Sequence, residues 1–557
     1  MKPWHERFAD IYAQERAYWQ SKGFTEEDPR RDGVAFTGTI TVRIKLDDTF
    51  EHHRFKLRVT YPAGYPYVQP TVAFLEPAIK RARHQGTDGA PCLFPPGAWT
   101  LNFPASEFYA AIERWLGYHL AGRFPRELAI YELPEYLRWS TLSVLAPPTA
   151  LAQIRDRRRG RFSVDELLGH DLGVVWSVDQ NEIGRELLYA VAPSRTPKTT
   201  RHVGSWYRLD QEPHPVHFTA ELERVLAANG HTVSFSTRPR ERELIALVFP
   251  DAALSEQRLL LLDIGVASKR ALAEVARGWP IRSPQLYLIS HEELFRRLEG
   301  VRDLALLEER HVVCFGLGAI GAALAHALTR EGVGSFALCD PDLLRPGNIV
   351  RHALDLLSVG QFKAEAVELA LAKINPAIET STETTNLTDP EVIAAKLANA
   401  DLVVLAIGED LKEELVSEIA AATAGRPPLL LARSLHGGDA FRVALMRPGI
   451  DACFTCLAAY QADGHPDWIA VPTDGRPDVF DHGCATPARP GAGLTSQHAA
   501  IFAAARGLDA LEQRPMDANH WLWVERPIPG ADPRLTNALT LHETRFPPRP
   551  DCPICGV

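Results

Sequence analysis

Cysteine is scarce in this chain, with eight residues among 557. So few thiols exclude a disulfide framework, and we expect a reducing, cytoplasmic setting in which each cysteine serves packing, metal binding or catalysis. No apolar run reaches the roughly 18 residues of a membrane span, and the opening residues MKPWHERFAD lack the apolar region of a secretory signal. The net charge of −10 argues against general binding to nucleic acid or to acidic membranes.

The length predicts several domains. Residues 1–145 read as a helix, an antiparallel strand meander, a long loop and a second helix, which is an α+β pattern. A proline pair and the arginine run RDRRRGR mark residues 146–161 as a basic linker. Residues 162–300 and 301–557 alternate strand-like and helical runs, which predicts two α/β domains.

The stretch GLGAIG places Gly316, Gly318 and Gly321 directly after the strand-like HVVCF and ahead of an alanine-rich helix. Glycines at such a junction permit a tight turn and let the backbone approach a phosphate at the helix N-terminus. Alone, the motif leaves two readings open, which are close strand–helix packing and the binding of a dinucleotide.

A set of polar residues follows the glycines at spaced positions: Asp340, Asp342, Asn348, Arg351 and Lys363. Asp340 ends the next predicted strand, where an acid binds a ribose hydroxyl in nucleotide-binding folds. A dinucleotide dehydrogenase has no need of the cations, whereas a triphosphate needs them to balance the charge that develops as pyrophosphate leaves. The pattern therefore favours ATP.

Two C-x-x-C pairs, CFTC and CPIC, place four thiols about a hundred residues apart in the chain: Cys453, Cys456, Cys552 and Cys555. Four thiolates form a closed tetrahedral Zn²⁺ site, which is structural rather than catalytic. Two redox-active pairs are the alternative, but neither pair opens a helix in a thioredoxin-like βαβ context. We therefore expect zinc to tie the C-terminus back onto its domain.

The remaining cysteines divide into two groups. Cys314 and Cys339 lie inside apolar strand-like runs and are predicted to belong to the core. Cys484 lies on a Gly/Pro-rich loop ahead of a helix, and Cys92 lies in the rigid stretch GAPCLFPPGAW. A loop thiol near a helix N-terminus favours a nucleophile, with an incidental loop cysteine as the alternative.

This sequence resembles the ATP site of the ubiquitin-activating superfamily, which includes the ThiF/MoeB-like adenylating enzymes. The resemblance lies in the order of the glycine loop, the two acids, Asn348, Arg351 and Lys363. The resemblance implies Rossmann-like adenylation domains, ATP with Mg²⁺, and adenylation of a protein C-terminus. It also implies that Cys484, between the zinc pairs, captures the acyl group as a thioester. The family usually carries an acid after the strand that corresponds to DLVVLAIG. In this sequence that acid is Glu409 or Asp410, and the sequence does not decide between them.

The first 140 residues resemble the ubiquitin-conjugating fold. The resemblance rests on a Tyr-Pro turn followed by spaced residues: Tyr61, Pro62, Pro66, His84, Gly89, Cys92, Leu93 and Trp99. It implies that Cys92 receives the acyl group and passes it to a lysine amine. The family's His-Pro-Asn is replaced by HQG, so the asparagine that supports amine attack is missing.

The whole layout is similar to the fused activating–conjugating enzymes of bacterial anti-phage operons. This resemblance implies an inactive adenylation-like domain at residues 162–300, a homodimer, and a substrate with a Gly-like C-terminal tail. The substrate is then a cyclic oligonucleotide synthase or a ubiquitin-like modifier, and the acceptor is a lysine-bearing protein. A sulfur-carrier adenylyltransferase for cofactor synthesis and a nonenzymatic scaffold are the two other hypotheses.

Overall fold

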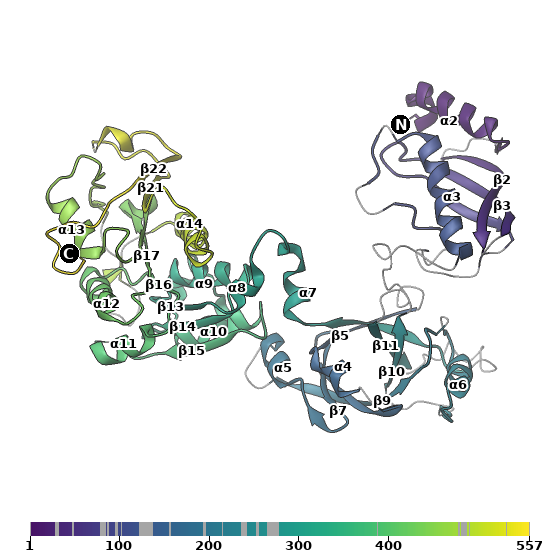
Figure 1. Cartoon of the computed structure of the whole chain (residues 1–557), viewed down its shortest axis with the longest axis horizontal. Coiled ribbons are helices and arrows are strands. Elements are labelled where there is room, and N and C mark those ends of the chain that lie inside the picture. The colour runs from purple at the N-terminus through teal and green to yellow at the C-terminus, as the bar shows by residue number, and fades with distance from the viewer. Residues whose placement is uncertain are drawn as a thin grey trace. The chain divides into compact units, whose positions relative to one another are not determined.

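Figure 1 shows the computed structural model of the chain. The chain divides into two compact units, residues 1–185 with 196–288 and residues 186–195 with 289–557. The structure describes residues 2–27, 33–46, 49–77, 79, 85, 89–94, 98–101, 103–121, 138–154, 157–192, 197–213, 216–235, 242–251, 256–264, 278–386, 388–476, 479–480, 487–488, 491–530 and 532–555.

The N-terminal part of the first unit is an antiparallel sheet with helices. The sheet has the order β1-β2-β3-β4. Its elements are α1 (Trp4–Arg7), α2 (Ala9–Ser21), β1 (Thr25–Glu26), β2 (Gly33–Leu46), β3 (Thr49–Pro62), β4 (Thr71–Glu76) and α3 (Ala105–Ala121). The expected order of helix, meander, loop and helix is therefore confirmed among the described residues.

The alternation of apolar residues explains this sheet. On β2, Ile40, Val42 and Ile44 are buried while the residues between them are exposed, and β3 buries Phe55 and Leu57 in the same way. Side chains of a strand point to opposite faces in turn, so one face packs and the other meets water. The packed face contacts α2 and α3 in one hydrophobic cluster.

The rest of the first unit contains an eight-stranded sheet in the order β5-β12-β11-β10-β9-β6-β7-β8. β5 also pairs with β7, so the sheet closes on itself. Its elements are β5 (Arg138–Ala146), α4 (Thr149–Gln153), β6 (Arg159–Leu167), β7 (Leu172–Val178), β8 (Asn181–Glu182), β9 (Thr199–Arg208), α6 (Thr219–Ala228), β10 (Glu243–Asp251), β11 (Glu256–Ile264) and β12 (Arg282–Leu288).

This closed sheet differs from the expected Rossmann-like α/β layers of residues 162–300. Among the described strands of this sheet, β5–β12, β5–β7 and β9–β10 pair in parallel, and the other pairs are antiparallel. Only four residues separate β10 from β11, which is too short for the crossover that parallel neighbours need. The helical run predicted at residues 268–278 lies almost wholly outside the described residues.

The basic linker predicted at residues 146–161 is also corrected. β5, which ends at Ala146, pairs with β12 and β7, and the first strand after it, β6, begins at Arg159. Ala150 of α4 is buried in the same cluster as Val144 of β5. These residues belong to the closed sheet, so the boundary precedes Arg138.

The second unit contains a sheet in the order β15-β14-β13-β16-β17-β18-β21-β22. The first five strands are parallel and the last three join in antiparallel pairs. Its strands are β13 (His311–Phe315), β14 (Ser335–Cys339), β15 (Glu379–Glu383), β16 (Leu402–Leu405), β17 (Leu429–Leu435), β18 (Ala440–Met446), β21 (His520–Val524) and β22 (Thr540–Thr544). This is the Rossmann-like topology expected of residues 301–557.

Helices and short turns accompany this sheet. They are α5 (Arg185–Val191), α7 (His291–Phe295), η4 (Arg296–Leu298), α8 (Leu304–Glu308), α9 (Gly321–Arg330), η5 (Pro346–Asn348), η6 (Leu356–Ser358), α10 (Lys363–Ala372), α11 (Pro390–Leu397), α12 (Asp410–Ala422), η7 (His436–Gly438), α13 (Phe454–Ala462), α14 (Gly493–Leu511) and η8 (Pro533–Leu535). A two-stranded pair joins β19 (Val479–Phe480) to β20 (Pro487–Ala488).

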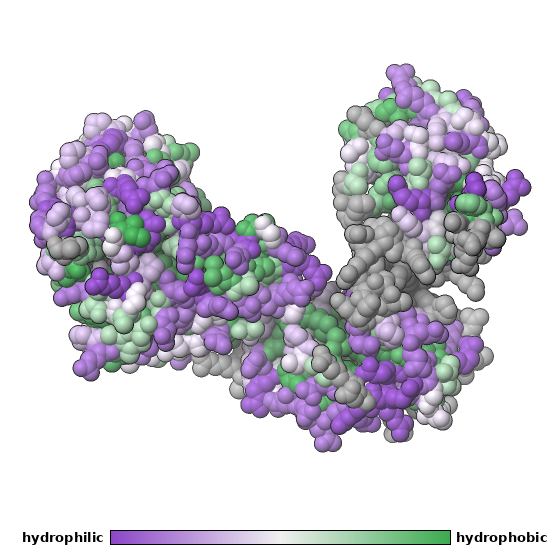
Figure 2. Space-filling view, in the orientation of Figure 1, coloured by the Kyte–Doolittle hydropathy of each residue, from purple (hydrophilic) through white to green (hydrophobic). Residues whose placement is uncertain are grey.

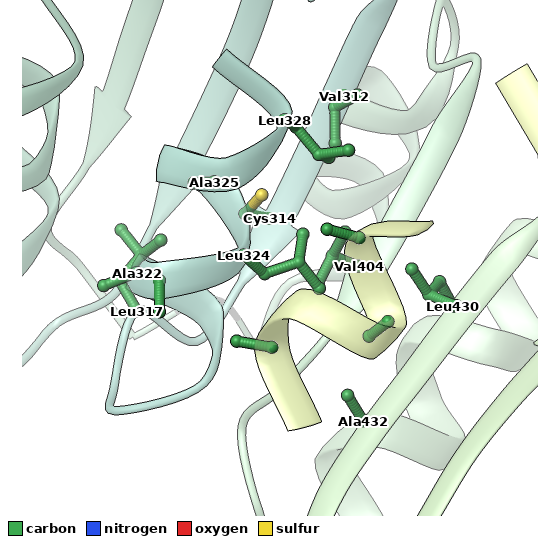
Figure 3. Close-up of a cluster of buried hydrophobic side chains, with 14 of the residues drawn as sticks. Val312, Cys314, Leu317, Ala322, Leu324, Ala325, Leu328, Val404, Leu430 and Ala432 are labelled. Carbon is green, nitrogen blue, oxygen red and sulfur yellow. The ribbon is translucent and has the colours of Figure 1, made fainter. Parts of the chain in front are cut away.

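Both faces of this sheet are covered. Figure 3 shows Cys314 of β13 beside Leu324 of α9 and Val404 of β16, within a larger buried cluster. The surface drawn in Figure 2 mixes hydrophilic and hydrophobic residues. None of the helices in the described part of the chain has the length and apolarity needed to cross a membrane.

Candidate functional site

The glycine loop joins β13 to α9 and needs its glycines for different reasons. Gly316 has φ of +86°, and a Cβ there would lie 2.5 Å from the Ala406 carbonyl oxygen. A Cβ on Gly321 would lie 1.9 Å from the Gly316 oxygen, so both positions are closed by the protein itself. Beside Gly318, no described residue other than its chain neighbours has an atom within 4 Å of such a Cβ. Gly318 therefore leaves the space through which a phosphate approaches the backbone.

The space in front of Gly318 is a cavity of about 170 Å³ at the carboxyl ends of the parallel strands. Ligands of open α/β sheets bind at this edge. The lining residues are Phe315, Gly316, Gly318, Cys339, Asp340, Pro341, Asp342, Lys363, Thr385, Asn386, Ala406, Ile407, Glu409, Lys412 and Val416. The structure thus brings together two of the predicted glycines, both acids and Lys363.

Asp340 organises this cavity. Its Oδ2 accepts a hydrogen bond from the Leu317 amide at 2.7 Å, and its Oδ1 accepts one from the Asp342 amide at 2.9 Å. The Lys363 Nζ lies 2.7 Å from Asp342 Oδ2 and 3.7 Å from Asp340 Oδ1. The carboxylate holds the glycine loop in place, and Lys363 brings a nearly buried cation to the cavity.

The geometry distinguishes the two acids that followed DLVVLAIG. Glu409 lines the cavity and pairs with Lys412 at 3.0 Å. Asp410 forms an ion pair with Arg433 instead. Carboxylates suit a hard divalent cation, so Glu409 and Asp342 are the side chains here that fit Mg²⁺ beside a triphosphate.

Asn348 and Arg351 are not among the residues that line the cavity. Asn348 Oδ1 accepts from the Arg345 amide at 3.0 Å and closes the turn η5. The Arg351 carbonyl accepts from Gln497 Nε2 at 3.2 Å, which places this segment against α14. The role predicted for Asn348 and Arg351 in ATP binding therefore stays a prediction.

His352, which the motif did not identify, connects that segment to the glycine loop. Its Nε2 donates to the Leu317 carbonyl at 2.7 Å, and its Nδ1 accepts from the Leu354 amide at 3.2 Å. Burial lowers the pKa of His352 and so favours the neutral ring that this arrangement requires. The sequence motifs also did not identify three other residues that line the cavity, Lys412, Thr385 and Asn386. Thr385 and Asn386 follow β15, and their position at the end of a parallel strand indicates a place at the ligand-binding edge of the sheet.

The four cysteines of the C-x-x-C pairs meet in the second unit. Their sulfur atoms all lie within 4.8 Å of one another, with Cys453 to Cys552 at 3.6 Å and Cys456 to Cys555 at 3.2 Å. Zn–S bonds of about 2.3 Å in a tetrahedron imply sulfur separations of about 3.8 Å. Four thiolates at these distances fit Zn²⁺.

Cys314 and Cys339 are core residues, as expected. Both are buried, and burial raises the pKa of the Cys339 thiol to about 12 and that of Cys314 further. A thiol with so high a pKa is almost entirely protonated near neutrality and is a poor nucleophile.

Cys92 is exposed, and the described residues that precede it make specific contacts. Gln85 and Pro91 form an isolated bridge, and Gln85 Nε2 donates to the Gly89 carbonyl at 2.6 Å. Gly89 has φ of +85°, a conformation that favours glycine. The backbone immediately before the thiol is therefore held by specific contacts.

The residues after Cys92 are anchored as well. Trp99 Nε1 donates to the Pro66 carbonyl at 2.8 Å, and the Phe94 ring packs on Phe103 with centroids 4.7 Å apart. Anchors on both sides present the thiol on the surface of the domain. The predicted residues His84 and Cys484 lie outside the described residues.

Residues 291–500 match the family described as the ThiF family. The chain is 22% identical to "Uncharacterized protein y4oA" of Sinorhizobium fredii, covering 93% of this chain and 92% of that protein. It is 33% identical to "ATP-dependent ubiquitin transferase-like protein Cap2" of Enterobacter hormaechei, but over 24% of this chain and 22% of that protein. The structure of E. coli MccB with ATP aligns with a TM-score of 0.35 and 20% identity over 45% of this chain and 68% of that one.

The matched residues contain the glycine loop, the acids and Lys363 that shape the cavity. Residues 291–500 of this chain are therefore similar to the ThiF family.

Proposed function

We propose that this protein is an ATP-dependent enzyme that activates the C-terminus of a protein as an acyl adenylate. The observation that carries the proposal is the cavity where Gly318, Asp340 and Lys363 meet within the ThiF match. The similarity to a protein named as an ATP-dependent ubiquitin transferase-like protein supports a protein substrate.

The first step forms a mixed anhydride. A carboxylate oxygen of the substrate tail attacks the α-phosphorus of ATP, the bond to the β-phosphate bridging oxygen breaks, and pyrophosphate leaves with the electron pair. Lys363 stabilises the negative charge that develops on the phosphates, and Asp340 holds the glycine loop against them. Glu409 and Asp342 would hold Mg²⁺ beside the phosphates, where the ion would supply further charge neutralisation.

The second step is a relay between two thiols. The Cys484 thiolate attacks the adenylate carbonyl and AMP leaves, which produces a thioester. Cys92 takes over the acyl group by transthioesterification, and a lysine amine of an acceptor protein then forms an amide as the Cys92 thiolate leaves. Support comes from the exposed, anchored Cys92 on a domain with the helix–meander–loop–helix order of conjugating enzymes. Such a relay requires reduced thiols, so we place the enzyme in the cytoplasm.

The substrate in this proposal is a protein with a Gly-like tail, and the Cap2 similarity favours a cyclic oligonucleotide synthase over a ubiquitin-like modifier. The zinc site keeps the C-terminal strands and the adenylating unit together. A sulfur-carrier adenylyltransferase would use the same cavity but would leave Cys92 without a role.

The test uses the purified full chain with ATP and a candidate tail protein, followed by nonreducing gels. We expect two thiol-sensitive adducts, of which one is absent in Cys92→Ala and both are absent in Cys484→Ala. Cys314→Ala serves as the control, because that thiol is buried in the core and does not line the cavity. Normal loading of Cys92 in Cys484→Ala would contradict the relay, and an absence of tail-dependent ATP–pyrophosphate exchange would contradict the adenylation itself.

We also propose a homodimer whose interface covers four exposed apolar side chains of the second unit, which are Val350, Leu356, Leu357 and Leu494. They are between 72% and 88% exposed. Leu357→Asp is expected to weaken self-association by about 100-fold, because a charge would be buried in the interface. Sedimentation velocity measures this, with Leu411→Asp on α12 as an equally exposed control. A wild-type protein that remains monomeric at tens of micromolar would rule out this dimer.

A further inference from the structure

A buried carboxylate in the N-terminal part of the first unit has no role in the proposed reaction. Glu15 of α2 is 5% exposed, and its neighbour Arg16 pairs with Glu26 at 2.7 Å. Among the described residues, no Lys, Arg or His forms an ion pair with Glu15. A charge that is taken out of water without a cation is costly, so the groups that bind this carboxylate must offset the cost.

Two tyrosines bind the carboxylate. Tyr61 Oη donates to Glu15 Oε2 at 2.5 Å, and Tyr65 Oη donates to Glu15 Oε1 at 3.0 Å. Trp19 Nε1 donates to Tyr61 Oη at 2.7 Å, which directs the hydroxyl proton of Tyr61 to the carboxylate. Burial and the charge of Glu15 raise the pKa of both tyrosines, so both hydroxyls keep the protons that they donate. Glu15 therefore fixes the turn at residues 61–66 through two side chains.

The same carboxylate reaches the start of α3. Burial raises the pKa of Glu15, and hydrogen bonds from the two tyrosines and from the Ala105 backbone act against that rise. Ala105 is the first residue of α3, where backbone N–H groups lack partners within the helix and a negative charge is favourable. Glu15 therefore joins the turn at residues 61–66 to the first residue of α3.

Trp99 packs on the turn at residues 61–66. Its Nε1 donates to the Pro66 carbonyl at 2.8 Å, and the centroid of its ring lies 6.1 Å from that of the Tyr65 ring. Pro66 directly follows the tyrosine that binds Glu15, so the position of this carbonyl depends on that hydrogen bond. The contacts of the carboxylate therefore place Trp99 as well.

The Cys92 segment packs on Trp99 and on the residue two positions before α3. The Trp99 and Phe103 ring centroids lie 4.9 Å apart, and the Phe94 ring lies 4.7 Å from Phe103 and 6.2 Å from Trp99. Phe94 follows Cys92 by two residues, and the leucine between them packs on the hydrophobic core of this part of the unit. The exposed thiol is thus placed by rings that the turn and the start of α3 hold.

We propose that Glu15 is a positioning residue for Cys92. By binding Tyr65 and the start of α3, it fixes the rings of Trp99 and Phe103 and so the place of the Cys92 sulfur during amide formation. In that step a lysine amine nitrogen bonds to the thioester carbonyl carbon, the carbon–sulfur bond breaks, and the electron pair stays on the Cys92 sulfur as thiolate. The amine proton passes to solvent. The inference rests on the proposed function for this step, whereas the placement of Cys92 is measurable without it.

The first experiment places a nitroxide spin label on Cys92 in the full chain with Cys484→Ser, so that one loop thiol is labelled. Glu15→Leu removes both acceptor oxygens. It is expected to shorten the rotational correlation time of the label by about twofold or more, at a temperature where circular dichroism shows a folded chain. Glu15→Gln keeps one carbonyl oxygen for the tyrosines, so its label is expected to be less mobile than that of Glu15→Leu.

The second experiment measures amide formation on the full chain with its own cysteines. Cys92 is loaded with ATP and the tail protein, ATP is removed, and discharge to free lysine is followed on nonreducing gels. Glu15→Leu is expected to slow discharge by about 10-fold, because displacement of a reacting group by about 1 Å is costly. Glu15→Gln is expected to recover part of the lost rate. ATP–pyrophosphate exchange is expected to stay within about twofold, since the nucleotide cavity lies in the other unit.

Asp10→Asn is the matched control. Asp10 lies on the same helix α2 but is exposed, so the label mobility and the discharge rate are expected to stay within about twofold of the wild type. If Glu15→Leu does not fold, Tyr65→Phe removes one hydroxyl and keeps the ring beside Trp99. It is expected to change both measurements in the same direction, and unchanged values would overturn the inference.

Two further outcomes decide between the inference and the proposed function. A label as immobile in folded Glu15→Leu as in the wild type, or an equal loss of exchange and discharge, would overturn this inference alone. A wild-type protein that forms no thioester on Cys92 would overturn the proposed relay. The spin-label comparison would then still decide whether Glu15 positions Cys92.

Discussion

Lys363→Ala is expected to reduce ATP–pyrophosphate exchange by about 100- to 1,000-fold, the cost of losing a preorganised charge at a reacting phosphate. Lys363 is the first residue of α10, is only 9% exposed, and reaches the cavity beside Asp342 and Asp340. Its removal leaves two carboxylates facing the incoming triphosphate without that cation. Repulsion then adds to the lost stabilisation, so both the affinity for ATP and the rate of exchange are expected to fall.

Lys373→Ala is the matched control for this variant. Lys373 follows the same helix α10 but is exposed and does not line the cavity. Its substitution is expected to leave exchange within about twofold and the unfolding temperature within about 1 °C. Exchange in Lys363→Ala close to that of the wild type would show that the cavity is not the adenylation site.

Loss of the proposed zinc site at the four cysteines is expected to have the largest effect on stability. Cys456→Ser, or removal of the metal by a chelator, is expected to lower the free energy of unfolding of the second unit by several kcal/mol, approaching the roughly 10 kcal/mol of structural zinc sites. Cys456 and Cys552 are buried in one hydrophobic cluster with Leu457 and Phe546, so the metal site and part of the core are lost together. Denaturant unfolding combined with zinc analysis by mass spectrometry measures both.

Cys92→Ser is the control for the metal measurement. Cys92 is exposed and lies in the other unit, so this variant is expected to retain one zinc ion per chain and wild-type unfolding. Purified wild-type protein without bound zinc, or Cys456→Ser with an unchanged metal content, would contradict a Cys₄ site.

Local patterns predicted much of the architecture. The alternation of Ile40, Val42 and Ile44 with exposed residues identified β2, since the period of a strand is contained within a few neighbouring positions. The same alternating runs in residues 162–300 were assigned to the wrong architecture. A run of apolar residues specifies a strand but not its neighbour, and the pairing of β5 with β7 joins segments that no local signal relates.

The candidate site was predicted unevenly for a similar reason. Asp340 and Lys363 follow from their places at a strand end and a helix start, and both line the cavity. Asn348 and Arg351 have the right types and order but do not line the cavity, and the Arg351 carbonyl accepts a hydrogen bond from Gln497 of α14. The order of residues in a motif specifies which chemistry is available, whereas the packing of the segment decides which side chains reach the ligand.

By itself, the sequence determined the glycine turn, the two C-x-x-C pairs and the strand alternation, because each depends on residues that are neighbours in the chain. Only the tertiary structure decided that Glu409 rather than Asp410 lines the cavity, because Asp410, at the start of α12, pairs with Arg433 of β17. It likewise decided that the four thiols meet and that Tyr61 and Tyr65 share the Glu15 carboxylate. Such contacts join residues distant in the chain, and the packing of the sheet and its helices brings them together.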